Sequence, residues 1–194
     1  MALRDILQTV LEGHLVARQE AFVAHPLAGF IRGEAVREVY EALGPQKQGM
    51  RVHGSAGAGQ WAAVPWIAVF DELVTDTATR GFYLVYLSHS TELTVHLSIN
   101  QGTTATRAEF KARARDVLKD RAALMRRRLE DFCQQLSVTS IGLGSHALLP
   151  GDYAAGHALG VTYNLATLPS ELVLREELKD CGGGLSRAHV SWRS

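Results

Sequence analysis

The sequence has little cysteine, no net charge and no long apolar run. Only Cys133 and Cys181 are present, without the CxxC or Cys/His spacing of a zinc site. Lysine plus arginine equals aspartate plus glutamate at 20 each, which excludes the global basicity of a histone-like binder. The apolar runs are far shorter than the roughly 20 residues that a membrane span needs. We therefore expect a reduced, soluble, cytoplasmic protein without a signal peptide, in which any anion site arises from local clustering.

Sequence signatures of catalysis are also missing. The histidines are scattered without a metal-ligand spacing such as HExxH, and no serine occupies a nucleophile elbow. A nuclease core needs clustered acids with a lysine. The nearest match, Asp71 with residues 109–111, places its second half on an expected helix. The chain also has no His/Asn/His array flanked by cysteines. We expect no catalytic residue, no cofactor and no metal here.

The length of 194 residues fits one compact domain with an ample hydrophobic core. We assign residues 1–180 to a single domain. The glycine-rich end of the sequence, residues 181–194, has the composition of a linker or terminal tail. No internal repeat is visible.

Apolar residues at helical spacing predict two N-terminal helices, in residues 2–22 and 27–43. The helical period returns over residues 106–136, which we expect to form the longest helix and which is rich in arginine and lysine. Thr104 or Thr106 is a plausible N-cap for this helix.

Between these helical regions lie short segments rich in β-branched and aromatic residues. They predict a meander of about four strands, within residues 50–55, 64–70, 81–89 and 92–100. After the basic helix we expect a strand from residue 137, a glycine-rich excursion, a strand near residues 160–166 and a final helix after Pro169. This order predicts an α+β fold with a central, mostly antiparallel, curved sheet flanked by helices.

The stretch GSAGAGQWAAVPW, residues 54–66, contains a cluster of glycine and alanine. It fails the P-loop pattern because Gly59 is followed by Gln60 and Trp61, and it fails the dinucleotide pattern because it lies between two strands. Such a backbone can approach another surface closely. The stretch is either an ordinary flexible hairpin loop or a loop that enters a groove of a partner.

Alternation along the strands places Val64, Trp66, Ala68 and Phe70 on one face of the sheet. In the next strand Tyr83, Val85 and Leu87 share a face. If Trp66 meets Tyr83 and Leu87 across the sheet, the three form an aromatic slot that suits a flat heterocycle. The alternative is that these aromatics are ordinary core residues.

Residues 50–72, followed by GFYLVYL and LTVHLSINQG, resemble the N-terminal domain of the McrB-like family. The members of this family read modified cytosine in modification-dependent, or type IV, restriction systems. The shared pattern is a basic strand, a glycine-rich loop, an aromatic, a hydrophobic-Pro-Trp strand and a Gly-hydrophobic-Tyr strand. The resemblance covers residues 1–105 well and the later helices only in general layout.

The resemblance implies that a methylated cytosine in duplex DNA is flipped into an aromatic pocket. Trp66 and Tyr83 would contact the ring, and Leu87 would lie against the base or its methyl group. Flipping costs a few kcal/mol of lost stacking and pairing, which a shaped pocket must offset. Asp71 could accept a hydrogen bond from the cytosine amino group, although it is also an ordinary strand-end residue.

The glycine-rich loop is expected to contact DNA. In the best-known family member an aromatic of this loop fills the gap left by the flipped base, but the matching residue here is Ala58. Gln60 or Trp61 could enter the stack, or water could fill the gap, and Trp61 could instead be buried under the loop. For phosphates we favour the strand and loop over the basic helix, which can be a solvated face. The expected loop and phosphate contacts are Arg51, His53, Ser55, Gly57, Ala58, Gly59, Gln60 and Trp61.

The expected partners are double-stranded DNA containing modified cytosine and a nuclease or GTPase domain or subunit, with no membrane involved. The chain itself would be a recognition domain rather than an enzyme. The alternative is a protein-interaction or oligomerisation module in which the aromatic cluster is core.

Overall fold

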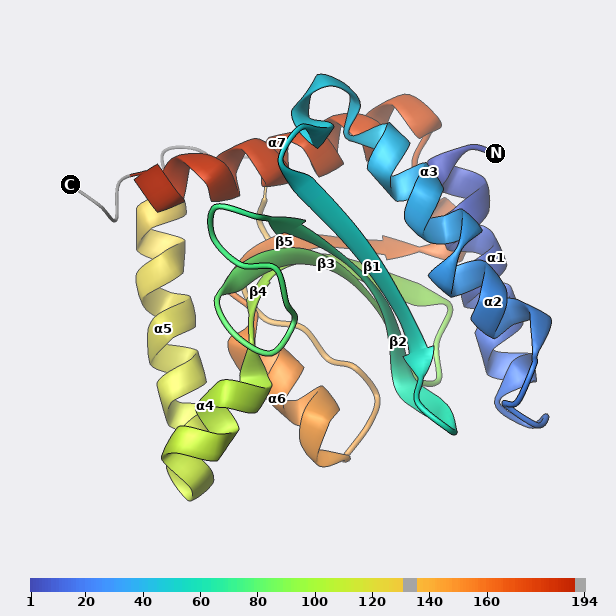
Figure 1. The fold of residues 1–194 in the computed structure, drawn as a ribbon, viewed down its shortest axis with the longest axis horizontal. Helices are drawn as coiled ribbons and strands as arrows, with labels where there is room; N and C mark the ends of the chain where they lie inside the picture. Colours follow the sequence, from blue (N-terminus) through green and yellow to red (C-terminus); the bar gives the residue numbers. More distant parts are fainter. Residues whose placement is uncertain (131–135, 191–194) are drawn as a thin grey trace.

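The computed structural model describes residues 1–130 and 136–190, with side chains described as far as Gly183. Cys133 and the expected end of the basic helix lie outside this part. Figure 1 shows a curved sheet with helices packed on both sides of it. The sheet is antiparallel with strand order β1-β2-β3-β4-β5. The predicted α+β class is therefore confirmed. Within the described ranges, no helix is both long enough and apolar enough to cross a membrane.

The strands follow the predicted meander. Hairpin connections join the first four, and the last returns beside β4 after the intervening helices. In place of the strand expected from residue 137, an isolated bridge joins Val138 to Gly160. The strands are β1 (Met50–Gly57), β2 (Trp61–Asp71), β3 (Phe82–Ser88), β4 (Thr94–Gln101) and β5 (Leu159–Asn164).

The first predicted helix is α1 (Leu3–Ala17), and the second is divided into α2 (Pro26–Arg32) and α3 (Glu34–Ala42). The division falls at Gly33, whose φ of −115° and ψ of −84° are not helical. Pro26 begins α2. A proline is tolerated there because the backbone N–H that it lacks would have no partner within the first turn of a helix. A short 3₁₀ turn, η1 (Gly44–Lys47), leads into β1.

The basic segment is not one helix as we predicted. It forms α4 (Thr103–Phe110), the 3₁₀ turn η2 (Lys111–Arg113) and α5 (Ala114–Leu129). The break occurs at Lys111, where φ is 50°, a value that continues no α-helix. Gly102 is the N-cap, rather than either threonine proposed for that position.

Two later helices complete the fold. The glycine-rich excursion contains α6 (Leu148–Gly156), which the sequence did not predict, and η3 (Leu165–Thr167) follows β5. The expected final helix, α7 (Glu171–Val190), has 20 residues and is longer than α5 with 16. It continues through Cys181, which is buried, so this part of the expected tail is helical.

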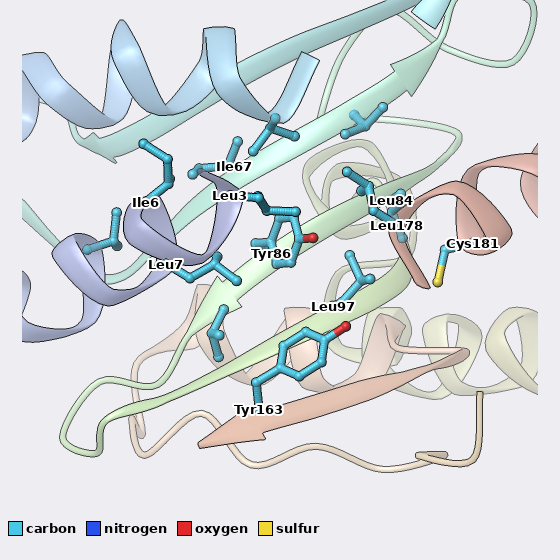
Figure 2. Packing of buried hydrophobic residues seen from close by; sticks show 14 of the residues in the cluster. Leu3, Ile6, Leu7, Ile67, Leu84, Tyr86, Leu97, Tyr163, Leu178 and Cys181 are labelled. Atoms are coloured by element: carbon cyan, nitrogen blue, oxygen red, sulfur yellow. The ribbon is translucent and has the colours of Figure 1, made fainter. Parts of the chain in front are cut away.

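The main core lies between one face of the sheet and helices α1, α2, α3, α5 and α7. Ile67, Leu84 and Leu97 point from three neighbouring strands into this layer, where Leu3 and Leu178 meet them from α1 and α7 (Figure 2). Both leucines from the strands have no exposed surface. Because burial of large aliphatic side chains contributes most to the free energy of folding, this layer is the main source of stability.

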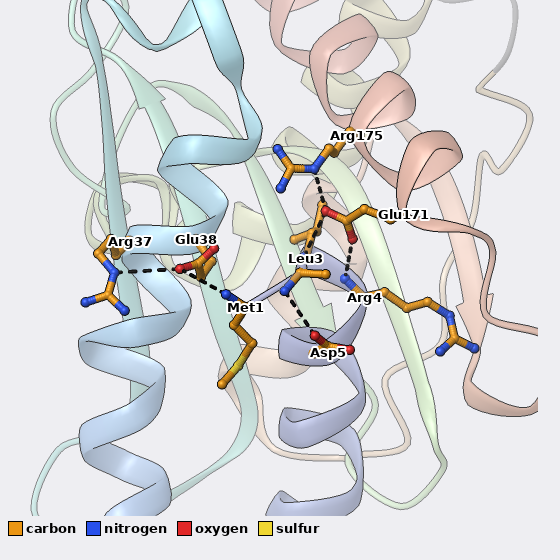
Figure 3. A network of polar contacts seen from close by, with 9 residues as sticks. Met1, Leu3, Arg4, Asp5, Arg37, Glu38, Glu171 and Arg175 are labelled. Atoms are coloured by element: carbon orange, nitrogen blue, oxygen red, sulfur yellow. Dashed lines mark hydrogen bonds and ion pairs between the residues drawn. The ribbon is translucent and has the colours of Figure 1, made fainter.

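Glu171 joins α7 to the start of α1. Its carboxylate accepts hydrogen bonds from the backbone N–H groups of Leu3, at 3.1 Å, and Arg4, at 2.9 Å, and it pairs with Arg175 (Figure 3). A carboxylate at a helix N-terminus satisfies donors that have no partner inside the helix. Burial favours the neutral acid, but these hydrogen bonds outweigh it and lower the pKa of Glu171.

The other face of the sheet has a smaller and more polar covering, made by α6 and the segment before it. On this face His96, Ser98 and Asn100 of β4 are buried and hydrogen-bonded. His96 Nε2 pairs with the carbonyl of Gly142 at 3.0 Å, and the Ser98 hydroxyl pairs with His157 Nδ1 at 2.7 Å. These bonds attach the covering segments to the sheet, so their position depends on polar geometry as well as apolar contact.

Candidate nucleic-acid interface

Trp66 lies at the centre of one row across the sheet. It pairs with Ser55 of β1 on one side and with Leu87 of β3 on the other. The His53 ring lies 5.6 Å from the indole, at 47° to it. The expected neighbourhood of Trp66 and Leu87 is therefore confirmed. Within this row Leu87 is buried, whereas Trp66 remains partly exposed.

Tyr83 is not part of this row, contrary to our expectation. Because Val69 pairs with Leu84, Tyr83 lies at the level of Phe70, and the two rings are 5.3 Å apart. Leu87 lies four positions after Tyr83, which is about 13 Å along a strand. Tyr83 is buried, which raises its pKa, and its hydroxyl lies 3.3 Å from two backbone carbonyl oxygens. It is a core residue.

Tyr153 of α6 provides the second aromatic side chain beside Trp66. It packs against the same apolar cluster as Trp66, it is partly exposed, and its phenol group lies within reach of the Trp66 indole. Burial raises the pKa of Tyr153 to about 12, so the phenol is neutral at physiological pH. No sequence pattern pointed to Tyr153, because it lies on a short helix with no strand pattern or motif around it.

Asp152 fixes the position of α6 next to Tyr153. Its side chain is nearly inaccessible to solvent and binds both oxygens to Arg107, with 2.9 Å between Nε and Oδ2. Arg115 Nε also donates to Asp152 Oδ1, at 2.9 Å. From the sheet, the Asn100 side chain donates to the Tyr153 carbonyl at 3.0 Å. Two helices and one strand thus set the position of the tyrosine.

Asp71 does not lie near Trp66. It is buried at the far end of β2, on the opposite face of the pleat, where it pairs with Met50. Its Oδ1 atom accepts a hydrogen bond from the Leu73 N–H at 3.0 Å. The proposed contact with a cytosine amino group in the Trp66 pocket is therefore wrong, and Asp71 instead stabilises the turn after β2.

The glycine-rich stretch forms the β1–β2 hairpin loop. Gly57 pairs with Trp61, and the tip between them is exposed. Gly57 has a φ of 127°, and an added Cβ would lie 2.0 Å from the Gln60 carbonyl oxygen, so only glycine fits. Arg32 donates to the Gly57 carbonyl at 2.7 Å. The loop is thus held in a defined conformation that exposes Ala58, Gly59 and Gln60.

Trp61 is packed beneath the loop, which resolves one alternative from the sequence. Its indole N–H donates a hydrogen bond to the Glu20 carbonyl at 3.1 Å. The centre of its ring lies 5.0 Å from the ring centre of Phe22 and 5.0 Å from that of His25. The ring centre of His14 lies 5.9 Å from that of the same indole, and burial lowers the pKa of His14 to about 4. Trp61 therefore anchors the hairpin to the α1–α2 connection.

Residues expected to contact phosphates and arginines of the basic segment have different environments. Arg51 and His53 are exposed on β1, on the same face as Trp66. Several arginines of the basic segment instead hold the fold together. Besides those on Asp152, Arg121 Nη1 donates to the Thr106 hydroxyl at 3.1 Å and its guanidinium lies 5.5 Å from the centre of the Phe110 ring.

Comparison with known proteins gives one match. A family model described as "MrcB-like, N-terminal domain" matches residues 9–182, which contain every strand of the sheet and every residue of the interface described above. A search of curated proteins found no match.

Proposed function

Because the chain belongs to the MrcB-like N-terminal domain family, we propose that it reads a modified cytosine in duplex DNA by base flipping. The family is one of DNA-binding domains of restriction systems, so DNA is the ligand of this chain. The observation that supports base flipping is the pair Trp66 and Tyr153. These two partly exposed aromatic side chains pack against one apolar cluster, on the face of the sheet that also carries the exposed residues Arg51 and His53.

In this proposal the extruded cytosine stacks against Trp66 and Tyr153, with Leu87 beneath them. Stacking on aromatic side chains is worth about 1 to 3 kcal/mol per base, which can offset the few kcal/mol that flipping costs. The apolar cluster against which both side chains pack and the ion pairs of Asp152 position the rings before DNA arrives. Less conformational freedom is then lost on binding.

The hairpin loop enters the duplex at the site that the base has left. Since Trp61 is held beneath the loop, Gln60 is the long side chain at the exposed tip, and its amide occupies the gap. Ser55, the backbone amides of Gly57, Ala58 and Gly59, and the side chains of Arg51 and His53 contact the adjacent phosphates. Phosphate contacts supply the affinity that does not depend on sequence.

We propose that this domain supplies recognition and that a nuclease or GTPase domain or subunit supplies cleavage. Its substrate is then a duplex marked by 5-methylcytosine or a related modification. The sheet, the loop and the aromatic pair together act as the specificity element of a modification-dependent restriction system.

A binding panel tests the proposal directly. Fluorescence anisotropy is measured with duplexes that differ at one position, which holds cytosine, 5-methylcytosine or 5-hydroxymethylcytosine. We expect tighter binding to at least one modified duplex, and we expect Trp66→Ala to reduce that preference by about tenfold or more. Tyr83→Phe is the matched control and retains the preference, since Tyr83 is core. Equal binding of the wild-type protein to all three duplexes would point instead to a protein-interaction module.

A further inference from the structure

A groove of about 460 Å³ lies between α5 and α6. One wall is the face of α5, and the other is made by α6 and the segment after residue 138. The residues that line it include the cations Arg115, Lys119 and Arg126 and the hydroxyl side chains Thr139 and Ser140.

The groove is strongly cationic, although the whole chain has no net charge. No acidic residue is among the described residues that line it. Arg115 binds Asp152 below the surface, but that carboxylate is shared with Arg107, so the three groups together keep a positive charge. Three cations facing two hydroxyls are a donor set that suits phosphate oxygens.

The two arginines keep hydrogen-bonding capacity for a ligand. Arg115 uses Nε for Asp152 and Nη2 for the Leu148 carbonyl, while Arg126 uses Nε and Nη2 for the carbonyls of Ala158 and Thr139. The Nη1 group of each has no partner in the described part of the chain. Their backbone bonds fix the guanidinium groups in place, so little side-chain entropy remains to be lost when an anion binds.

The groove and the proposed base pocket lie on either side of α6. Ile141 lines the groove and belongs to the apolar cluster that contains Leu87. Ala154 also lines the groove and follows Tyr153, which contacts Trp66 on the other side of α6. In Figure 1, α6 lies beside α4 and α5 on the side of the sheet away from α7.

We propose that the α5–α6 groove binds backbone phosphates of the DNA duplex next to the recognised base. The inference rests on the DNA-binding role of the chain, which it deepens by adding a second contact surface to the hairpin loop. Lys119 is the central residue, because its ammonium group is exposed and makes no ion pair within the described residues. These contacts are independent of base identity, so they strengthen binding to modified and plain DNA alike.

A salt titration of Lys119→Gln tests the groove. We expect affinity to fall about three- to tenfold on modified and plain duplex alike, and the slope of log K against log[salt] to become shallower by about 0.9. Arg127→Gln is the matched control: Arg127 is an exposed cation on the same helix that does not line the groove, and its replacement leaves the slope closer to the wild-type value. A wild-type slope for Lys119→Gln would overturn the proposal.

Two further readouts separate this inference from base reading. The ratio of affinities for modified and plain duplex reports on the aromatic pair. A ratio of one would contradict base reading, but the salt slope would still test the groove. Calorimetry with inorganic phosphate at constant ionic strength completes the design. Saturable phosphate binding that Lys119→Gln abolishes, together with an unchanged DNA slope, would identify a free-anion site and overturn the DNA assignment.

Discussion

The two faces of the sheet have different chemistry although the same strands build both. One face presents Ile67 and Leu84 to a thick layer of helices and is almost entirely apolar. The other presents Trp66 and Leu87 to a thin covering made by α6 and the segment before it. Since successive side chains of a strand point to opposite faces, one strand supplies stability and recognition through alternate residues.

Polar side chains distinguish the second face further. His96, Ser98 and Asn100 of β4 are buried there, and each is hydrogen-bonded to the covering segments or to its neighbours. Buried polar groups add little net stability, but they fix geometry, because an unpaired group is costly. The comparison indicates that the second face is built to hold α6, and with it Tyr153, in one position.

The largest expected effect comes from a pair of leucines on opposite faces of β3. Leu84→Ala should lower the free energy of unfolding by about 2 to 5 kcal/mol, measured by urea denaturation, because it leaves a cavity in the main core. The folded variant should keep its preference for modified DNA. Leu87→Ala should also destabilise the protein, but it should lower that preference as well. Equal effects of the two variants on the preference for modified DNA would contradict the division of roles between the two faces of the sheet.

A pair of carboxylates gives the next test. Asp152→Asn should lower the free energy of unfolding by about 1 to 3 kcal/mol, since it weakens two arginine contacts, and it should reduce the preference for modified DNA by displacing Tyr153.

Glu171→Gln is the control on the other face, where the carboxylate joins α7 to α1. It should destabilise the protein without changing the preference. A stable Asp152→Asn variant with wild-type preference would show that the ion pairs do not position the tyrosine.

Stability should fall in mild acid because of two buried histidines. Burial lowers the pKa of His14 and of His157 to about 4, against an ordinary value of 6.5. Between these pH values the unfolded chain binds more protons than the folded one, so the free energy of unfolding decreases as pH falls from about 6.5 to 4. Urea denaturation at several pH values measures the decrease. Replacing His157 with Gln should flatten it, and an unchanged pH profile in that variant would contradict the assignment.

The smallest expected effect concerns the loop tip. Gln60→Ala should weaken binding to the preferred modified duplex about two- to tenfold, the range for one lost hydrogen-bonding group. Anisotropy measures the change. Gln48→Ala, a matched substitution before the start of β1, is the control and should have no effect. Equal affinities of Gln60→Ala and wild type would show that the gap is filled by another group.

Local patterns were sufficient to predict the sheet and part of the site. Alternation placed Trp66 and Leu87 on one face, and the structure pairs them. Alternation cannot set register, however, and the long connection between β2 and β3 leaves register to tertiary packing, so Tyr83 was assigned to the wrong row. Tyr153 could not be found, because its contact with Trp66 joins distant parts of the chain.

The basic segment illustrates a second limit. Its charge density suggested either a solvated face or a DNA surface, but the structure uses Arg107 and Arg121 for internal contacts and leaves Lys119 in the groove. The break at Lys111 reorients the two halves of the segment and decides which cations face solvent. Helical periodicity over a continuous window does not reveal such a break.

Base-analogue fluorescence tests the central claim most directly. A fluorescent base whose emission is quenched by stacking is placed next to the modified cytosine, and emission is followed on saturation with protein. We predict a rise with the wild-type protein, because the neighbouring base loses its stacking partner, and little rise with saturating Trp66→Ala. Unchanged emission in the saturated wild-type complex would contradict extrusion of the base into the pocket formed by Trp66 and Tyr153.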